Sequence, residues 1–521
     1  MMNTQSKFAG PGKDGRDVEI VPQKTAPAIN SLKQKTISGI SWVLIAQVTI
    51  QLVSFIISVI LARLLVPADF GLIGMVTVFV GFATLITKMG FRQALIQKLD
   101  VEERHYSSVF WTNTAIGACM TLLMSLSAPL IARFYGEPRL LPLTIAMSFA
   151  FLLSSINIIQ ETKLYREFKF RRLAIMNITS AIVSGGAGLG LALAGYGVWS
   201  LVAQMLLSLA IDAILLWTSA RWRPRLHFAW ADIRELLGFA ANLSGYTFLD
   251  YWSRNADNLL VGRFLGPGAL GIYSRSYNLM LLPVTQLSMI VGQVMYPSLA
   301  SVQKDHALVR RLYLKAITGI ALISFPLMLG LMVVSHTFVE VLLGSKWRAV
   351  APILSYLCLV GMIRSITIGG KWVYQSQGRT DIMLRWELIK SPVLICVFII
   401  GVASGSLERL AQIYTAAIVI AFYVDLRLPA RIIGLTVWTC LKRLSGVTVC
   451  AVVMALVVLF IDRTLAANLN VYARLLVDIV TGFVIYLGLL SAFKIGPYTE
   501  NLKLIAEQWR LRRGRLRFLR V

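Results

Sequence analysis

Polar side chains recur along one face of the first long apolar stretch of the chain. Gln47, Gln51, Ser54 and Ser58 follow one another at spacings of four, three and four residues. These spacings place all four side chains on one side of an α-helix. Their amide and hydroxyl groups can donate and accept hydrogen bonds. The stripe therefore predicts a helix face that is turned toward a cavity rather than toward lipid.

A second stripe, 200 residues further along the chain, adds charge. The aligned positions are Thr247, Tyr251, Arg254 and Asn258. Asp250 precedes Arg254 by four residues, and Asp257 follows it by three. A charge at the bilayer centre costs about 3 kcal/mol or more, so we expect these groups to face a cavity and to pair with one another. Two interpretations remain open: a structural ion pair between Arg254 and an aspartate, or an anion ligand at Arg254 with the aspartates holding a proton or another cation.

Other cations lie within later apolar stretches. Arg364 has no partner that the sequence identifies, and Arg275 and Asn278 are weaker candidates of the same kind. The candidate substrate-binding residues are Arg254, Arg364, Gln47, Gln51, Arg275 and Asn258. The candidate ion-coupling residues are Asp250 and Asp257.

Four more charged residues lie toward the expected inner ends of apolar stretches. Lys88 and Arg92 can be interpreted equally well as the positive charges that set membrane topology or as substrate ligands. Asp212 and Asp425 have similar placements near the ends of the sixth and twelfth stretches, where capping by nearby arginines is the simpler interpretation.

The elements that would position these residues are membrane-spanning helices. Of 521 residues, 57% are hydrophobic and 15% are charged, and the apolar residues form repeated runs of bilayer-spanning length. We therefore predict an all-α polytopic membrane protein with about fourteen transmembrane helices. The expected spans are 37–61, 70–90, 108–132, 141–159, 174–194, 198–219, 234–260, 270–298, 312–335, 349–371, 388–404, 410–427, 445–461 and 472–492. Lysine and arginine concentrate in alternate loops, which predicts that both termini are cytoplasmic.

A repeated motif divides the spans into two sets of six. The pattern R-x-L-x-P-x-x-x-G occurs at 63–71 and again at 263–271. Six is even, so two six-helix repeats would share one topology around a central cavity. We expect the motif to form a structural corner at the outer end of the first hairpin of each half, with Arg63 and Arg263 at the membrane interface. The expected domains are a disordered basic cytoplasmic N-terminus (1–35), the first half (36–219), the second half (220–430), two additional helices (431–495) and a basic amphipathic cytoplasmic tail (496–521).

Composition and missing motifs exclude several functions. The net charge of +26 follows the cytoplasmic loops of a membrane protein, so we predict no nucleic-acid partner. The five cysteines lie in apolar stretches without metal-like spacing. The sequence contains no G-x-x-x-x-G-K-[ST], H-E-x-x-H or G-x-S-x-G motif. We therefore predict a transporter rather than an enzyme, with no catalytic residues, cofactor or metal.

Several stretches together carry a family resemblance. They include DYWSRNADNLLVGRFLGPGALGIYSRSYNLMLLPVTQ at 250–286, VMYPSLASVQKD at 294–305, GFRQALIQ at 90–97 and QSQGRTDIMLR at 375–385. Within them, Asp257, Gly262 and Arg263 form one motif and Leu270, Gly271 and Tyr273 another. The chain resembles the bacterial polysaccharide exporters of the Wzx type, which belong to the multidrug/oligosaccharidyl-lipid/polysaccharide superfamily. The resemblance covers about residues 35–430.

This resemblance implies a function. It implies a flippase that moves polyprenyl-diphosphate-linked oligosaccharides across the bacterial inner membrane for exopolysaccharide or lipopolysaccharide biosynthesis, by ion-coupled alternating access. The implied partners are the lipid-linked oligosaccharide, membrane lipids and, as candidates, a polysaccharide polymerase and chain-length proteins. The alternative is a cation-coupled small-molecule or multidrug exporter of the same superfamily, whose cavity would be dominated by acidic residues.

Overall fold

The computed structural model describes residues 25–87, 92, 95–96, 101–220, 222–466 and 469–493. The first half of the chain forms α1 (Thr25–Leu64), α2 (Pro67–Thr87), α4 (Glu103–Tyr135), α5 (Leu140–Ser155), α6 (Ile158–Arg166), α7 (Phe170–Leu193) and α8 (Val198–Ser219). The second half forms α9 (Trp230–Ser301), α10 (His306–Val333), α11 (Ser335–Leu342), the short 3-10 helix η1 (Ser345–Trp347), α12 (Val350–Thr367), α13 (Gly369–Ser376), α14 (Thr380–Ala403) and α15 (Leu407–Ile432). Two further helices follow, α16 (Val437–Thr464) and α17 (Val471–Ala492).

The predicted all-helical architecture with about fourteen spans is confirmed. Thirteen helices in the described part of the chain are long and apolar enough to cross a membrane. One of them is the 48-residue part of α9 from Arg254 to Ser301, and α9 as a whole extends through both the seventh and the eighth predicted spans. The backbone of α9 leaves the helical conformation at Gly266, with φ 83° and ψ 178°. The two spans are therefore joined by a kink instead of the expected loop.

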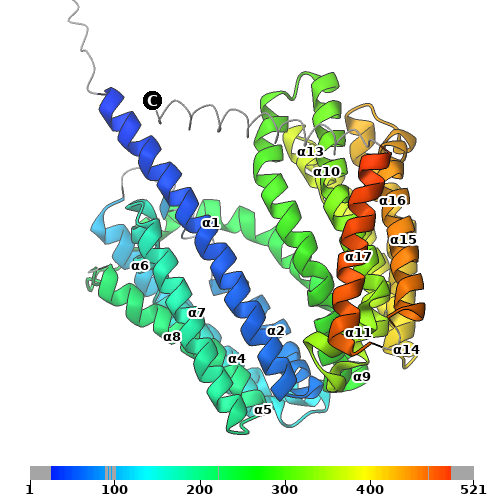
Figure 1. The fold of residues 1–521 in the computed structure, drawn as a ribbon. Helices are drawn as coiled ribbons and strands as arrows, with labels where there is room; N and C mark the ends of the chain where they lie inside the picture. Colours follow the sequence, from blue (N-terminus) through cyan, green and yellow to red (C-terminus); the bar gives the residue numbers. More distant parts are fainter. Residues whose placement is uncertain are drawn as a thin grey trace, which may run out of the picture.

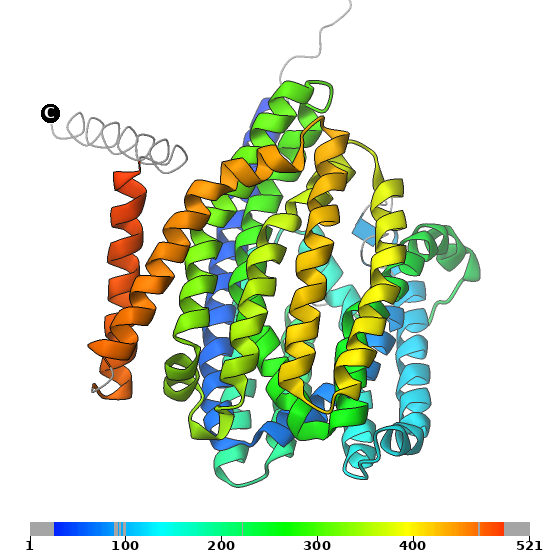
Figure 2. The same ribbon diagram turned by 90° about the vertical axis from the view of Figure 1, so that its right-hand side faces the viewer.

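The helices gather in two groups with α9 between them. Figure 1 shows α4–α8 on one side of the molecule and α10–α17 on the other. Figure 2, turned by 90°, shows α17 at the margin, where it packs on α16. The start of α1 and the end of α17 lie at the same end of the molecule (Figure 1), as an even number of crossings requires. We call this the inner end and the opposite one the outer end.

The chain ends differ in part from the expected domains. Residues 25–35, expected to be disordered, belong to α1. The segment TAPAINSLKQK contains Ala, Leu, Lys and Gln, which favour helix and can extend it beyond an apolar span. The predicted amphipathic tail, 496–521, lies outside the described residues.

One span of each half is broken near its inner end. The span predicted at 141–159 consists of α5 and α6, which are separated at Ile156 and Asn157. The span predicted at 349–371 consists of α12 and α13, which are separated at Ile368. The break recurs at matching places, which agrees with the internal duplication.

The two copies of the repeated motif pack directly on each other at the outer end. A Cβ atom added to Gly71 would lie 1.7 Å from the carbonyl oxygen of Pro267, and one added to Gly271 would lie 1.9 Å from that of Pro67. Each proline lies in the first turn of the helix after the corner, where its missing N–H is not needed. The motif is thus a reciprocal contact between the halves, which the sequence alone did not predict.

The motif arginines also reach across to the other half. Arg63 donates hydrogen bonds to the carbonyl oxygens of Leu342, at 3.1 Å, and of Val341. The guanidinium of Arg263 lies 5.7 Å from the ring centre of Phe134 at the end of α4. The Trp347 indole N–H adds a 2.7 Å bond to the Ala62 carbonyl. The two halves are therefore held together at their outer ends.

Candidate functional site

A polar cavity lies between α1 and the second segment of α9. Its volume is about 390 Å³. From α1 it is lined by Gln51, Ser54 and Ser58, three of the four residues of the predicted stripe. The polar lining from α9 consists of Arg275, Asn278, Thr285 and Gln286. The stripe therefore faces a cavity, and its neighbour is the eighth predicted span rather than the seventh.

Arg275 is the charged group of this cavity. Its guanidinium donates a 2.6 Å hydrogen bond to the Ser58 hydroxyl and a 3.4 Å bond to the Ser58 carbonyl. It also lies over the ring of Phe70, 4.2 Å from the ring centre, and 5.8 Å from that of Trp347. Its Nε–H is buried and has no partner among the described residues.

None of these contacts neutralises Arg275. Its hydrogen-bond acceptors are a neutral hydroxyl and a carbonyl, and no carboxylate pairs with it in the described part of the chain. An arginine that is held by uncharged groups keeps its positive charge and can bind a phosphate through a charge-assisted bond. Arg275 is therefore better placed to receive an anion than the sequence indicated.

An apolar groove adjoins the polar cavity. Its volume is about 760 Å³, and it extends between α1, α9, α10, α16 and α17. Phe55, Leu279 and Leu282 line both the cavity and the groove, so the two spaces meet along these side chains. The combination provides a polar, cationic compartment beside a much larger hydrocarbon-like one.

Arg364 is held by two tyrosines in the second half. It hydrogen-bonds the Tyr414 hydroxyl at 3.0 Å and the Tyr277 hydroxyl, and it lies 5.5 Å from the ring centre of Tyr277. Both partners are neutral phenols, so they position the guanidinium without cancelling its charge. Among the described residues, the hydrogen-bond partners of Arg364 are thus two hydroxyl groups and not a carboxylate, as the sequence predicted.

Asp257 is buried close to this group and does not pair with Arg254. Its carboxylate accepts a 2.9 Å hydrogen bond from the Tyr273 hydroxyl and a 2.7 Å bond from the backbone N–H of Asn258. The Tyr273 and Tyr277 rings lie 6.1 Å apart, and Asp257 attracts Arg364 electrostatically. The described residues therefore show no ion pair between Arg254 and Asp257, whereas the other candidate partner of Arg254, Asp250, has its side chain outside the described part of the structure.

The remaining candidates are more dispersed. Arg254 and Gln47 are exposed, on α9 and α1 respectively, and Asn258 is half-buried. Asp250 belongs to α9, but its side chain lies outside the described part of the structure. Gln51 and Arg275 therefore line the same cavity, and Asp257 lies in electrostatic range of Arg364. Arg254 and Gln47 belong to neither of these two groups of residues.

The sequence ranked Arg275 too low and did not identify Tyr414. Tyr273 and Tyr277 belong to an aromatic-rich segment near the seventh predicted span, which an interfacial belt or sugar stacking would explain, and neither interpretation links them to Asp257 or Arg364. One signal could have identified these two tyrosines: they follow one another at four residues and precede or follow Arg275 by two. The four-residue spacing places both tyrosines on one helix face, and the two-residue offset places that face roughly opposite to Arg275.

Comparison with protein families identifies a model described as "Polysaccharide biosynthesis protein" over residues 60–352, which is more than half of the chain. The teichuronic acid biosynthesis protein TuaB of Bacillus subtilis is 29% identical over 93% of this chain and 99% of its own length. The lipopolysaccharide biosynthesis protein WzxC of Escherichia coli is 29% identical over 71% of this chain and 76% of its own. The succinoglycan biosynthesis transport protein ExoT of Rhizobium meliloti is 25% identical over 73% and 77%, respectively.

Two solved structures share the fold. The lipid II flippase MurJ in an inward closed conformation superposes with a TM-score of 0.72 at 15% identity, over 86% of this chain and 98% of MurJ. An inward-facing multidrug resistance transporter of the MATE family superposes with a TM-score of 0.57 at 14% identity, over 74% and 95%. At these identities, the similarity establishes the fold.

Proposed function

Because this chain belongs to the polysaccharide biosynthesis family of bacterial multi-pass membrane transporters, we propose that it flips polyprenyl-diphosphate-linked oligosaccharide units across the inner membrane. The units would serve exopolysaccharide or lipopolysaccharide biosynthesis. We also propose that both chain termini lie in the cytoplasm, as the distribution of lysine and arginine between the loops predicts, so that the inner end of the molecule would receive the substrate.

The observation that carries this proposal is the junction of the polar cavity with the apolar groove. A polyprenyl-linked oligosaccharide is strongly amphipathic, with an anionic diphosphate between a sugar chain and a long hydrocarbon chain. The groove of about 760 Å³ suits the hydrocarbon, and Arg275 in the neighbouring cavity suits the diphosphate. The amide side chains of Gln51 and Asn278 can hydrogen-bond sugar hydroxyls or phosphate oxygens.

The other predicted substrate residues complete the proposed path. Arg254 and Gln47 are exposed and are proposed to contact the substrate before it reaches the cavity. Arg364 and Asn258 flank the Asp257 group. We propose that the substrate diphosphate competes with Asp257 for the charge of Arg364.

The outer-end contacts support an alternating-access cycle. The reciprocal packing at Gly71 and Gly271 holds the halves together on the side opposite to the proposed substrate uptake. Release to the outer leaflet would require these contacts to separate while the halves rock about the central site. The two six-helix repeats provide the rigid bodies for this motion.

Ion coupling is proposed to use Asp250 and Asp257. We expect Asp257→Asn to weaken the dependence of flipping on a proton or sodium gradient, because the variant cannot exchange charge beside Arg364. The measurement is the flipping rate in proteoliposomes with and without each imposed gradient. Tyr414→Phe, which removes one hydrogen bond to Arg364 but no charge, is the matched control and should keep the dependence. An unchanged gradient dependence in Asp257→Asn would return this residue to a structural role.

The alternative is a cation-coupled small-molecule exporter. It requires acidic side chains to dominate the cavity, whereas the charged residue lining the α1–α9 cavity is Arg275. The cavity chemistry therefore favours an anionic, lipid-linked substrate.

Deletion of the gene tests the proposed function in cells. We expect a polyprenyl-diphosphate oligosaccharide to accumulate in the inner leaflet, because its synthesis continues while its export stops. Mass spectrometry of the extracted lipids would identify the sugar unit. A deletion strain without such an intermediate, but with an intact polysaccharide, would contradict the proposal. Loss of the polysaccharide without the intermediate would place the defect in the synthesis of the lipid-linked unit and would also contradict the proposal.

A further inference from the structure

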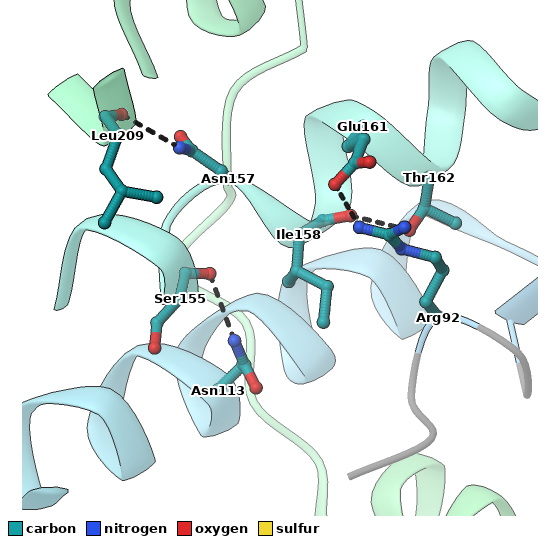
Figure 3. Close-up of polar contacts among 8 residues, drawn as sticks. All are labelled: Arg92, Asn113, Ser155, Asn157, Ile158, Glu161, Thr162 and Leu209. Atoms are coloured by element: carbon teal, nitrogen blue, oxygen red, sulfur yellow. Dashed lines mark hydrogen bonds and ion pairs between the residues drawn. The ribbon is translucent and has the colours of Figure 1, made fainter. Parts of the chain in front are cut away.

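The first half contains a second polar cavity, which the proposed substrate path does not use. It has a volume of about 330 Å³ and lies within the bundle of α4–α8, toward the inner end. Figure 3 shows the polar groups that α4, α5, α6 and the Arg92 segment contribute there. The lining residues that matter here are Arg92, Asn113, Asn157, Glu161, Asn177 and Asp212.

Three oxygen atoms of the lining have no hydrogen-bond donor. They are Asn113 Oδ1, Asn157 Oδ1 and Asp212 Oδ1, which are buried and unpartnered among the described residues. Asn113 is 1% exposed and Asn157 is 6% exposed. Unsatisfied buried acceptors of this kind cost free energy and are normally matched by a ligand or donor.

The orientation of both amides is fixed by their other ends. Asn113 Nδ2 donates to the Ser155 carbonyl at 3.1 Å, and Asn157 Nδ2 donates to the Leu209 carbonyl at 3.5 Å (Figure 3). Flipping either amide would place an oxygen against a carbonyl oxygen. Both amide oxygens therefore remain available as acceptors in the cavity, and carboxylate and carbonyl oxygens are the ligands that suit hard cations.

The formal charges of the lining indicate a monovalent ligand. Arg92 pairs with Glu161, so these two charges cancel. Among the lining residues that the structure describes, Asp212 then leaves one negative charge, which one monovalent cation would neutralise.

The second half shows how the chain itself can satisfy a carboxylate at a related place. Asp425 accepts a 2.6 Å bond from the Lys390 ammonium and a 2.6 Å bond from the Trp386 indole N–H. Lys390 and Ser180 are each the eleventh residue of their helices, α14 and α7, whereas Asp425 is the nineteenth residue of α15 and Asp212 the fifteenth of α8, about one turn earlier. Ser180 donates to the Ser208 carbonyl at 2.8 Å, one turn before Asp212. In the second half, the Lys390 ammonium therefore neutralises Asp425. In the first half, α7 carries Ser180 instead of a lysine, and Asp212 lines the cavity.

We propose that this cavity binds an alkali-metal cation through Asp212 Oδ1 and the amide oxygens of Asn113 and Asn157. The bound cation takes the place that the Lys390 ammonium holds in the second half. A role of this cation in coupling rests on the proposed function, whereas its binding does not and can be measured without transport.

Thermal unfolding of the purified full-length protein tests binding. NaCl and KCl are each compared with choline chloride at equal ionic strength and fixed pH. We expect the unfolding midpoint to rise with Na⁺ or K⁺ and to saturate, because a ligand that binds the folded state stabilises it. Asp212→Asn should abolish this rise. Thr121→Ala, which removes another polar group of α4 that bonds Gly117 and Ser148, should keep it.

Ser180→Lys provides the opposite test. We expect the introduced ammonium to pair with Asp212, so that the variant is stable in choline chloride and no longer responds to Na⁺ or K⁺. Wild-type protein that responds to neither ion overturns the proposal, as does an Asp212→Asn variant that responds like wild type. A midpoint that depends on pH through Asp212, but on neither ion, would make this a proton site and would also overturn it. If the protein bound the cation but did not flip lipids, the proposed function would be contradicted and the cation site would stand.

Discussion

Arg275→Ala should lower the rate of lipid-linked oligosaccharide flipping by roughly one to two orders of magnitude. Hydrogen bonds to charged groups contribute about 1.5–3 kcal/mol, and each 1.36 kcal/mol is about tenfold in rate. The Arg275 guanidinium is held by Ser58 and by the ring of Phe70, without a carboxylate partner in the described part of the chain. Its charge is therefore available to the substrate diphosphate.

Two variants separate charge from fold in this experiment. Arg275→Lys keeps the charge but loses the planar fork, so we expect partial activity. Arg348→Ala removes an arginine that pairs with Glu340 on the outer surface, so flipping should continue at the wild-type rate. The role of Arg275 would be refuted by an Arg275→Ala protein that is folded and flips as fast as wild type.

Gly71→Ala and Gly271→Ala should each destabilise the protein and reduce flipping strongly. The added methyl groups would lie 1.7 Å and 1.9 Å from backbone carbonyl oxygens of Pro267 and Pro67. A backbone atom cannot rotate away as a side chain can, so the outer ends of the two halves must separate. Overpacking of this kind costs about 1–3 kcal/mol. The measurements are the thermal unfolding midpoint and the distance between spin labels on the outer ends of α2 and α9.

Gly268→Ala is the matched control for these two variants. Gly268 lies in the same corner, and a Cβ atom there would have no neighbour within 4 Å. We expect wild-type stability and flipping, since alanine also favours helix more than glycine does. If Gly71→Ala behaved like this control, reciprocal packing of the corners would not be what holds the outer ends together.

The sequence predicted the spans well because their signal is local. Apolar runs, charge alternation between loops and the repeated corner each depend on neighbouring residues, and they yielded about fourteen helices, of which twelve form two repeats. The break between α5 and α6 and the one between α12 and α13 were missed, since the apolar runs continue across them. The reciprocal contact of Gly71 with Pro267 could not be derived because it joins residues 196 positions apart.

The sequence predicted the types of residue that line the candidate site, but it predicted only part of their placement. Helical spacing correctly placed Gln51, Ser54 and Ser58 on one cavity face. The same reasoning left Asp250 and Asp257 open as partners of Arg254 because all three lie on one helix, whereas the Asp257 carboxylate accepts its hydrogen bonds from Tyr273 and the Asn258 backbone and lies in electrostatic range of Arg364 on α12. Which helix lies opposite a polar stripe is set by tertiary packing, and periodicity within one helix does not contain that information.

The central claim is that this chain moves a polyprenyl-diphosphate oligosaccharide between leaflets through the site at Arg275. Its most direct test is a proteoliposome assay in which the labelled lipid starts in one leaflet and its sugar is detected from the opposite side over time. We predict that wild-type protein accelerates its appearance well above that in protein-free liposomes, and that Arg275→Ala does not. Folded wild-type protein that leaves the rate at the protein-free value, for the lipid-linked intermediate of its own pathway, would contradict the account.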